Sequence, residues 1–445
     1  MSGSFRRAAR RCLDPLLSIA LGIASGRALR AMREVADRPR CPGPIRVVFL
    51  VQYLPAWNKI EPVHRAMLAS EEFEPVIVCV PNDVRSRRGK HLDPRANETY
   101  AHLVSEGYEV INAVTEEGEW ADLRVFNPDF VFHGRPYNNF MPACYRSGHV
   151  ASYAQIGSIM YGASWTDNYV DVAFNGDYFK DVSIYFAEDG WNAQVFEDKF
   201  DKGVAQGLQE AVFAGSPVLE GLYARKAASD GAWEHFSAGG QRVLWTPRWS
   251  TDKRIGGSHF LEYRKWFRNY AERHPERSFI VRPHPLMFGN FVQTGEMSQV
   301  EVDDFRAWCA KTANVHLDES PEYLDTLAAA DVLVMDTSSI VLEAFFTGNP
   351  IVYCVPDGIG VVPDYQPMAD TFYEARSAEE VESALERLVQ EDPAAIRSRH
   401  DAMIQLADKL AVGSTDRVLE GLKRRLRPEM CEKTEREDEP SLDTD

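Results

Sequence analysis

Short apolar runs alternate with helical patterns along most of the chain. Ile45–Gln52 is a continuous apolar run with the length of a strand buried on both faces. Val76–Val80, Tyr108–Asn112 and Phe130–Phe132 have the same character, and a helical pattern covers Ile60–Ala69. Strands that alternate with helices predict a parallel sheet covered by helices, with ligands at the carboxyl ends of its strands.

A second series of the same kind begins at Val243. Its strands are expected at Val243–Trp245, Phe279–Val281, Val332–Met335 and Ile351–Cys354, and His259–Arg273 has the pattern of an amphipathic helix. The chain has 445 residues, 44% of them hydrophobic, enough for two cores. We therefore predict an α/β protein with two Rossmann-like domains, residues 45–237 and 238–426, between a basic segment at 1–44 and a disordered acidic tail at 427–445.

A polar turn follows the predicted strand Val332–Met335. Ile340–Thr347 then has the pattern of a helix, and Gly348 ends it. A turn with hydroxyls, a carboxylate and free backbone N–H groups at a helix N-terminus suits a phosphate group. The donor-binding candidates in this turn are Asp336, Thr337, Ser338 and Ser339.

Glu343 is a carboxylate within an apolar helix, where an unpaired charge is costly. Ser339 and Glu343 are four residues apart and share one helical face. A hydroxyl and a carboxylate beside a phosphate-binding turn are expected to hold the ribose of a nucleotide. Alternatively, Glu343 pairs with an internal arginine.

Two further strand ends carry cationic or hydroxyl groups, and prolines stiffen the backbone around them. Since parallel strands end at one edge of a sheet, these groups are expected beside the polar turn, as a diphosphate requires. A histidine that only stabilises its own turn is the alternative for His284. The donor-binding candidates here are Thr246, Arg248, Arg282 and His284.

His133 directly follows the strand Phe130–Phe132 in the first domain. A histidine at a strand's carboxyl end, with Arg135 and Tyr137 nearby, is a candidate general base. The alternative is a histidine whose hydrogen bonds are satisfied by local backbone.

The formal net charge of −18 speaks against nucleic acid as a partner of the whole chain. The seven cysteines form no C-x-x-C pair, which favours a reducing compartment and no structural zinc. No metal-binding motif of the His/Cys type is present, so no metal or cofactor is expected.

Arginines flank an apolar stretch of 12 residues, Leu13–Ala24, near the amino terminus. A helix that crosses a bilayer needs roughly 20 such residues. We expect an amphipathic helix on an anionic membrane surface, with the protein in the cytoplasm or on the inner face of the cell membrane. A disordered tail or a secretory signal is the alternative.

Several motifs occur in one order along the chain. They are Tyr161-Gly162, Gly215-Ser216-Pro217, Thr246-Pro247-Arg248-Trp249, Arg282-Pro283-His284-Pro285, and Asp336-Thr337-Ser338-Ser339 followed by Glu343. In this order they resemble the CDP-glycerol glycerophosphotransferase family, which includes the teichoic-acid primases and polymerases, over about Val131–Asp357. The resemblance implies the GT-B architecture, two Rossmann-like domains with a cleft between them. It also implies a donor diphosphate contacted by His284 and by the Asp336–Ser339 turn.

The chain departs from that family at the catalytic base. The polymerases carry a His-Gly pair where this chain has Tyr161-Gly162. An unperturbed tyrosine titrates near pH 10 and is a poor base at neutral pH. Both His133 and Tyr161 are therefore catalytic candidates, and His133 is expected to contribute more.

The resemblance implies a transferase that moves a phospho-alditol or sugar from a nucleotide-activated donor, such as CDP-glycerol, to a cell-surface glycan or lipid-linked acceptor. Cell-wall polysaccharide synthesis is the expected setting. An NDP-sugar 2-epimerase and an inactive nucleotide-binding homologue are the alternatives.

Overall fold

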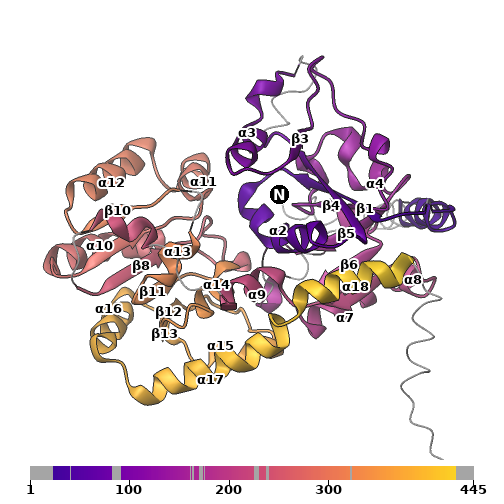
Figure 1. The fold of residues 1–445 in the computed structure, drawn as a ribbon. Coiled ribbons are helices and arrows are strands. Elements are labelled where there is room, and N and C mark those ends of the chain that lie inside the picture. Colours follow the sequence, from indigo (N-terminus) through magenta and orange to yellow (C-terminus); the bar gives the residue numbers. More distant parts are fainter. Residues whose placement is uncertain are drawn as a thin grey trace, which may run out of the picture. The chain divides into compact units, whose positions relative to one another are not determined.

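The computed structural model describes residues 24–40, 42–82, 92–160, 162, 165–169, 174, 176–224, 230–236, 240–320 and 323–426. The chain divides into two compact units, each built on a parallel sheet (Figure 1). Unit 1 holds the residues up to 161, then 174–214 and those from 415 onward. Unit 2 holds 162–173 and 215–414.

Unit 1 is built on a seven-stranded parallel sheet in the order β3-β2-β1-β4-β5-β6-β7. The four strands predicted in this unit are present; β1, β2 and β4 are largely buried, whereas the edge strand β3 is only half-buried. The strands are β1 (Ile45–Val51), β2 (Phe73–Cys79), β3 (Val110–Asn112), β4 (Phe130–His133), β5 (Gln155–Ile159), β6 (Ile184–Ala187) and β7 (Glu210–Phe213).

Helices cover the sheet of unit 1, and the last helix of the chain is one of them. Val418 and Leu422 of this helix, α18, lie in the same core as the stacked rings of Phe49 and Phe132. A Cβ atom at Gly421 would lie 2.7 Å from the Phe186 ring, so the helix approaches the sheet where it has no side chain. The helices are α2 (Leu54–Leu68), α3 (Glu98–Ser105), α4 (Ser147–Val150), α6 (Gly176–Phe179), α7 (Gly190–Lys199), α8 (Asp201–Val204) and α18 (Ser414–Leu426).

Residues 24–36 are helical and pack on unit 1 rather than standing apart from it. Ala28 and Met32 are buried, and the Arg33 guanidinium donates to the Gln206 side chain at 2.6 Å. The rest of the predicted membrane-surface segment, residues 1–23, lies outside the described residues. Within the described part of the chain, no helix combines the length and apolarity that crossing a membrane requires.

Unit 2 is built on a six-stranded parallel sheet in the order β10-β9-β8-β11-β12-β13. β11 and β12 have the bounds that the sequence predicts. The strands are β8 (Arg242–Thr246), β9 (Ser278–Val281), β10 (Val315–Leu317), β11 (Val332–Met335), β12 (Ile351–Cys354) and β13 (Tyr373–Ala375).

Aromatic side chains fill the core of unit 2 where α10 packs on the sheet. Trp245 of β8 stacks on Phe260 at 5.4 Å, and Phe267 packs on Phe279 of β9. The helices are α9 (Pro217–Ala224), α10 (Phe260–Arg273), α11 (Met287–Thr294), α12 (Gln299–Lys311), α13 (Leu324–Ala328), α14 (Ile340–Phe345), α15 (Gln366–Ala369), α16 (Ala378–Arg387) and α17 (Pro393–Leu410).

Candidate functional site

The candidate site is the carboxyl edge of three neighbouring strands in unit 2. β9, β8 and β11 lie side by side and run parallel, so their carboxyl ends meet at one edge. The loops that leave this edge begin at Arg282, Pro247 and Asp336. The predicted convergence of the three strand ends is therefore confirmed.

Asp336 ties the turn after β11 to the connection between β8 and α10 through its carboxylate, which is 0% exposed. One oxygen accepts the Arg248 backbone N–H at 2.8 Å and the Ser258 hydroxyl at 3.3 Å. The His259 backbone N–H is 3.3 Å from that oxygen, and His259 Nδ1 is 2.7 Å from the other. The sequence predicted that Asp336 would contact the donor. In the structure both carboxylate oxygens instead accept hydrogen bonds from protein groups. Asp336 therefore positions the Arg248 backbone and His259.

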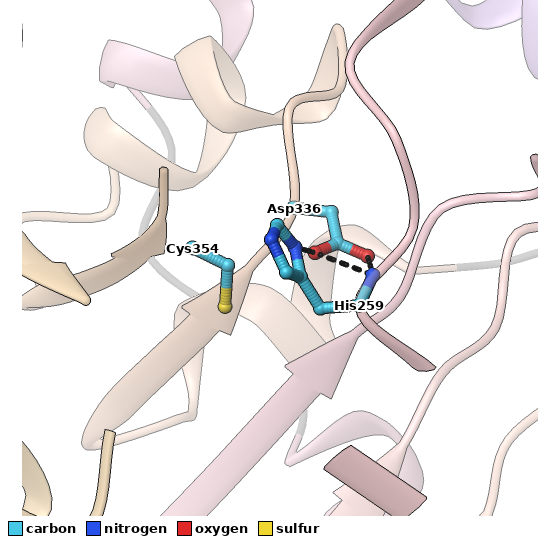
Figure 2. Close-up of side chains that lie close together, drawn as sticks. All are labelled: His259, Asp336 and Cys354. Carbon is cyan, nitrogen blue, oxygen red and sulfur yellow. Dashed lines mark hydrogen bonds and ion pairs between the residues drawn. The ribbon is translucent and has the colours of Figure 1, made fainter. Parts of the chain in front are cut away.

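His259 precedes α10 and lies against the Asp336 carboxylate, as Figure 2 shows. Its Nδ1 carries a proton toward Asp336, and its ring stacks on Tyr263 at 5.2 Å. Burial lowers the pKa of His259, but the hydrogen bond and the charge of Asp336 outweigh it and hold that pKa above its usual value. The surroundings of His259 therefore favour its protonated form.

Sequence reasoning missed His259 as a site residue. The sequence predicted His259 as the first residue of the amphipathic helix, whereas the structure places it just before α10, after a Gly-Gly-Ser segment. The segment Gly256-Gly257-Ser258 lies between a strand and a helix. Two adjacent glycines in such a loop indicate that its backbone packs closely against a neighbour. A Cβ atom at Gly256 would lie 2.9 Å from the Thr337 side chain.

Cys354 ends β12 and completes a group of three possible metal ligands with His259 and Asp336. One ligand atom of each lies within 4.8 Å of the other two (Figure 2). Burial, with a smaller effect of the Asp336 charge, raises the pKa of the Cys354 thiol well above its usual value. An ion at this place would have to replace the hydrogen bond between His259 and Asp336.

Arg248 and His284 are the two predicted cationic contacts that the structure brings together. Arg248 is 6% exposed, and its guanidinium donates to the Thr337 carbonyl oxygen. Burial and then the Arg248 charge lower the pKa of His284 to about 4. Nδ1 of His284 accepts the Leu286 backbone N–H at 3.1 Å, so the proton of the neutral ring is on Nε2. His284 is thus a neutral hydrogen-bond donor beside a guanidinium.

The turn after β11 is braced by aromatic side chains. The Thr337 hydroxyl forms a hydrogen bond with the Tyr353 hydroxyl at 2.6 Å, and the Ser338 carbonyl oxygen accepts the Trp165 Nε1–H at 2.8 Å. Thr337 is buried, so its hydroxyl serves the core rather than a ligand. Ser338 and Ser339 are only half-buried. They are the hydroxyls of this turn that a phosphate could reach.

Arg282 and Glu343 belong to a separate network. Arg282 forms an ion pair with Asp318, and its guanidinium lies 5.5 Å from the centre of the Tyr323 ring. The Tyr323 hydroxyl donates to the Glu343 carboxylate, which is 3% exposed. The predicted partnership of Glu343 with Ser339 around a ribose is thus replaced by a buried bond to a tyrosine.

Thr246 ends β8 at the same edge of the sheet. Its side chain is buried, and its hydroxyl oxygen has no hydrogen-bond partner among the described residues. A buried hydroxyl without a partner costs free energy, which a ligand or water can recover. Its role in donor binding stays a prediction.

His133, the predicted general base, is 4% exposed at the end of β4. Its Nε2–H donates to the Tyr145 carbonyl oxygen at 2.7 Å, and its ring meets Tyr178 edge-on at 5.3 Å. Burial lowers the pKa of His133 to about 4, and the backbone hydrogen bond opposes this only in part. These surroundings oppose a base exposed to substrate, and local backbone satisfies only Nε2, since Nδ1 is buried without a hydrogen-bond partner among the described residues. Tyr161, the other catalytic candidate, lies outside the described residues.

Two Rossmann-like units of this kind define the GT-B fold class. Neither a protein-family model nor a curated protein sequence matches the chain. A UDP-N-acetylglucosamine 2-epimerase structure is similar over 91% of this chain and 100% of its own, with a TM-score of 0.55 and 12% identity.

Two further solved structures are similar in the same way. The UDP-GlcNAc 2-epimerase from Neisseria meningitidis, bound to UDP-GlcNAc, has a TM-score of 0.54 and 13% identity over 85% of this chain and 100% of its own. A variant of the wall teichoic acid polymerase TagF has a TM-score of 0.51 and 8% identity. The match covers 97% of this chain and 99% of the polymerase chain. At such identities the likeness concerns the fold.

Proposed function

We propose that the chain is a transferase that binds a nucleotide-diphosphate donor at the carboxyl edge of unit 2. It passes a phospho-alditol or sugar group to a glycan or lipid-linked acceptor. The observation that carries the proposal is the Asp336 carboxylate, which holds the Arg248 backbone and His259 at one edge of the sheet. Without this buried anion, the Arg248 backbone N–H and His259 would lose their shared acceptor.

The groups at this edge suit a diphosphate. The Arg248 guanidinium supplies positive charge, the raised pKa of His259 favours its protonated form, and Nε2 of His284 supplies a hydrogen-bond donor. When the bond to the transferred group breaks, negative charge grows on the departing phosphate. Fixed cations and donors stabilise that charge without reorganising. This edge therefore favours reactions in which a nucleotide leaves.

The acceptor hydroxyl must lose a proton as it attacks. His133 is a poor base for this step because its pKa of about 4 leaves it little affinity for a proton at neutral pH. We propose that a phosphate oxygen of the donor, or Tyr161, takes the proton instead.

An NDP-sugar 2-epimerase is the second candidate function. Two of the three similar structures named above are 2-epimerases, and their TM-scores exceed that of the polymerase. An epimerase changes its nucleotide sugar without any acceptor, whereas a transferase releases the nucleotide only when an acceptor is present.

Calorimetric titration of the full chain with CDP-glycerol, CDP-ribitol, UDP-sugars and GDP-sugars would identify the donor. The donor that binds is then incubated with the protein alone, and the products are separated. Unchanged donor in this incubation supports a transferase, and an epimerised sugar supports the second candidate. Failure of every nucleotide to bind would contradict both.

Replacing His284 by alanine is expected to weaken donor binding by about 1–3 kcal/mol, the contribution of a hydrogen bond to a charged group. The fold should survive, because the ring is only half-buried. His400→Ala is a matched control in the same unit, since His400 is exposed on α17. Equal donor affinity in the two folded variants, measured by titration calorimetry, would remove His284 from the site.

A further inference from the structure

A pocket of about 640 Å³ lies in unit 1, at the opposite edge of its sheet from the strand carboxyl ends. Arg46, Gln155 and Glu210 line it from the starts of β1, β5 and β7. The chain after the 24–36 helix and the end of α18 complete it. The residues that line it lie up to 391 positions apart in the sequence, from Val35 to Leu426.

The lining is strongly basic although the chain as a whole carries −18. Only two carboxylates, Asp129 and Glu210, face five guanidinium groups, an excess of three positive charges. Such an excess is unfavourable unless an anion compensates it. The five arginines are Arg38, Arg40, Arg46, Arg424 and Arg425.

Each of the two carboxylates is shared by two arginines. Asp129 accepts from Arg40 at 3.1 Å and lies 3.9 Å from Arg46. Glu210 accepts from Arg424 at 3.2 Å and from Arg425 at 3.0 Å. One negative charge therefore balances only half of each pair.

Arg38 pairs with no carboxylate among the described residues, and the contact of Arg46 with Asp129 is the longest of the four ion pairs in the pocket. Arg38 donates to the carbonyl oxygens of Tyr153 and Ser152 at 3.2 and 3.5 Å, and these neutral acceptors do not cancel its charge. Nε of Arg46 is buried and has no hydrogen-bond partner among the described residues. This Nε lies 3.9 Å from Asp129, too far for a hydrogen bond, so the carboxylate compensates the guanidinium only in part.

We propose that this pocket binds a phosphate-bearing anion, through Arg38 and Arg46 in particular. Guanidinium groups match the geometry of phosphate oxygens and can donate two hydrogen bonds to one group. Pro39, Pro128 and Leu426 also line the pocket and offer apolar surface to the organic part of a phosphate ester. A soluble phosphate ester and the headgroup of an anionic phospholipid share this chemistry. The site is separate from the donor site, which lies in unit 2.

The test uses the full chain and two probes. Titration calorimetry with inorganic phosphate measures the soluble source. Sedimentation with phosphatidylcholine vesicles, with and without phosphatidylglycerol, measures the lipid source. Arg38→Gln is the main variant, because Arg38 is exposed and its loss should leave the fold intact. Arg46→Gln is the second, and Arg124→Gln is the control, an exposed arginine of unit 1 that pairs with Asp122 outside the pocket.

We expect both pocket variants to weaken binding of at least one probe about tenfold, the effect of losing one hydrogen bond to a charged group, while Arg124→Gln does not. Added salt should weaken the same interaction. A loss confined to the vesicles assigns the site to a lipid headgroup, and a loss with phosphate assigns it to a soluble ester. The proposal is overturned if Arg38→Gln, folded as judged by circular dichroism, binds both probes like the unaltered chain, or if the unaltered chain binds neither.

Discussion

Replacing Asp336 by alanine is expected to lower the free energy of unfolding of unit 2 by about 3–5 kcal/mol, the cost of removing one partner of a buried charged pair. The carboxylate is fully buried, and it accepts from the Arg248 and His259 backbones and from the His259 ring. Alanine leaves all of these donors without an acceptor. Denaturant unfolding of the full chain, followed by a probe in unit 2, measures the loss.

Asp331→Asn is the matched control for this prediction. Asp331 also accepts a backbone N–H, from Arg242 at 2.8 Å, but it is exposed. Its replacement should cost about 1 kcal/mol or less. Asp336→Asn should fall between the two, since one side-chain oxygen remains. If Asp336→Ala proved as stable as Asp331→Asn, the carboxylate would not be what holds the site together.

Acidification is expected to destabilise unit 1 between about pH 6.5 and pH 4. Burial lowers the pKa of His64 to about 4, with a smaller contribution from the Arg65 charge, and burial likewise lowers that of His133 to about 4. Below pH 6.5 the unfolded chain binds protons that the folded chain refuses, so stability falls with pH. Below about pH 4 the folded rings also become protonated, and the loss levels off.

Each of these two histidines should contribute up to about 3 kcal/mol to the loss, from 1.36 kcal/mol per pKa unit. His64→Phe isolates one of them, because the ring lies among Phe49, Trp57 and Tyr108 and its buried Nδ1 has no hydrogen-bond partner. Urea unfolding at several pH values should give a shallower dependence for this variant. His149→Gln, an exposed histidine of the same unit, serves as the control. Parallel profiles for His64→Phe and the unaltered chain would refute the prediction.

Pattern alone was enough for β1 to β4 of unit 1 and for the central strands of unit 2, whereas β5, β6 and β7 of unit 1 were not predicted. Val332–Met335 and Ile351–Cys354 are continuous apolar runs with helices on both sides, and the structure gives them the same bounds. The outer strands β10 and β13 were not predicted. They have three residues each, and His316 and Glu374 interrupt their apolar character at the sheet margin. An edge strand has one neighbour, and its sequence is correspondingly less constrained.

The edge that gathers the candidate site was predictable for the same reason, since parallel strands must end together. What could not be predicted was which side chains turn outward from it. The Glu343 carboxylate accepts a hydrogen bond from Tyr323, 20 residues earlier in the chain, and no local sequence pattern predicts such a pairing. His133 is covered because the chain folds back and brings the Tyr145 carbonyl oxygen onto its ring. These outcomes depend on tertiary packing rather than on the spacing of residues.

The place of α18 bears on the order in which the chain can fold during synthesis. Unit 2 is complete once Ser414 has left the ribosome, because its other segment, residues 162–173, comes earlier in the chain. Most of unit 1 precedes the main part of unit 2, which begins at Gly215. At that moment, however, the core of unit 1 still lacks Val418 and Leu422. The unit that is synthesised first is therefore the last to complete its core. Until α18 is made, one part of its sheet keeps an apolar surface exposed. A chaperone that shields such a face would be needed longest by the part of the protein that is made first.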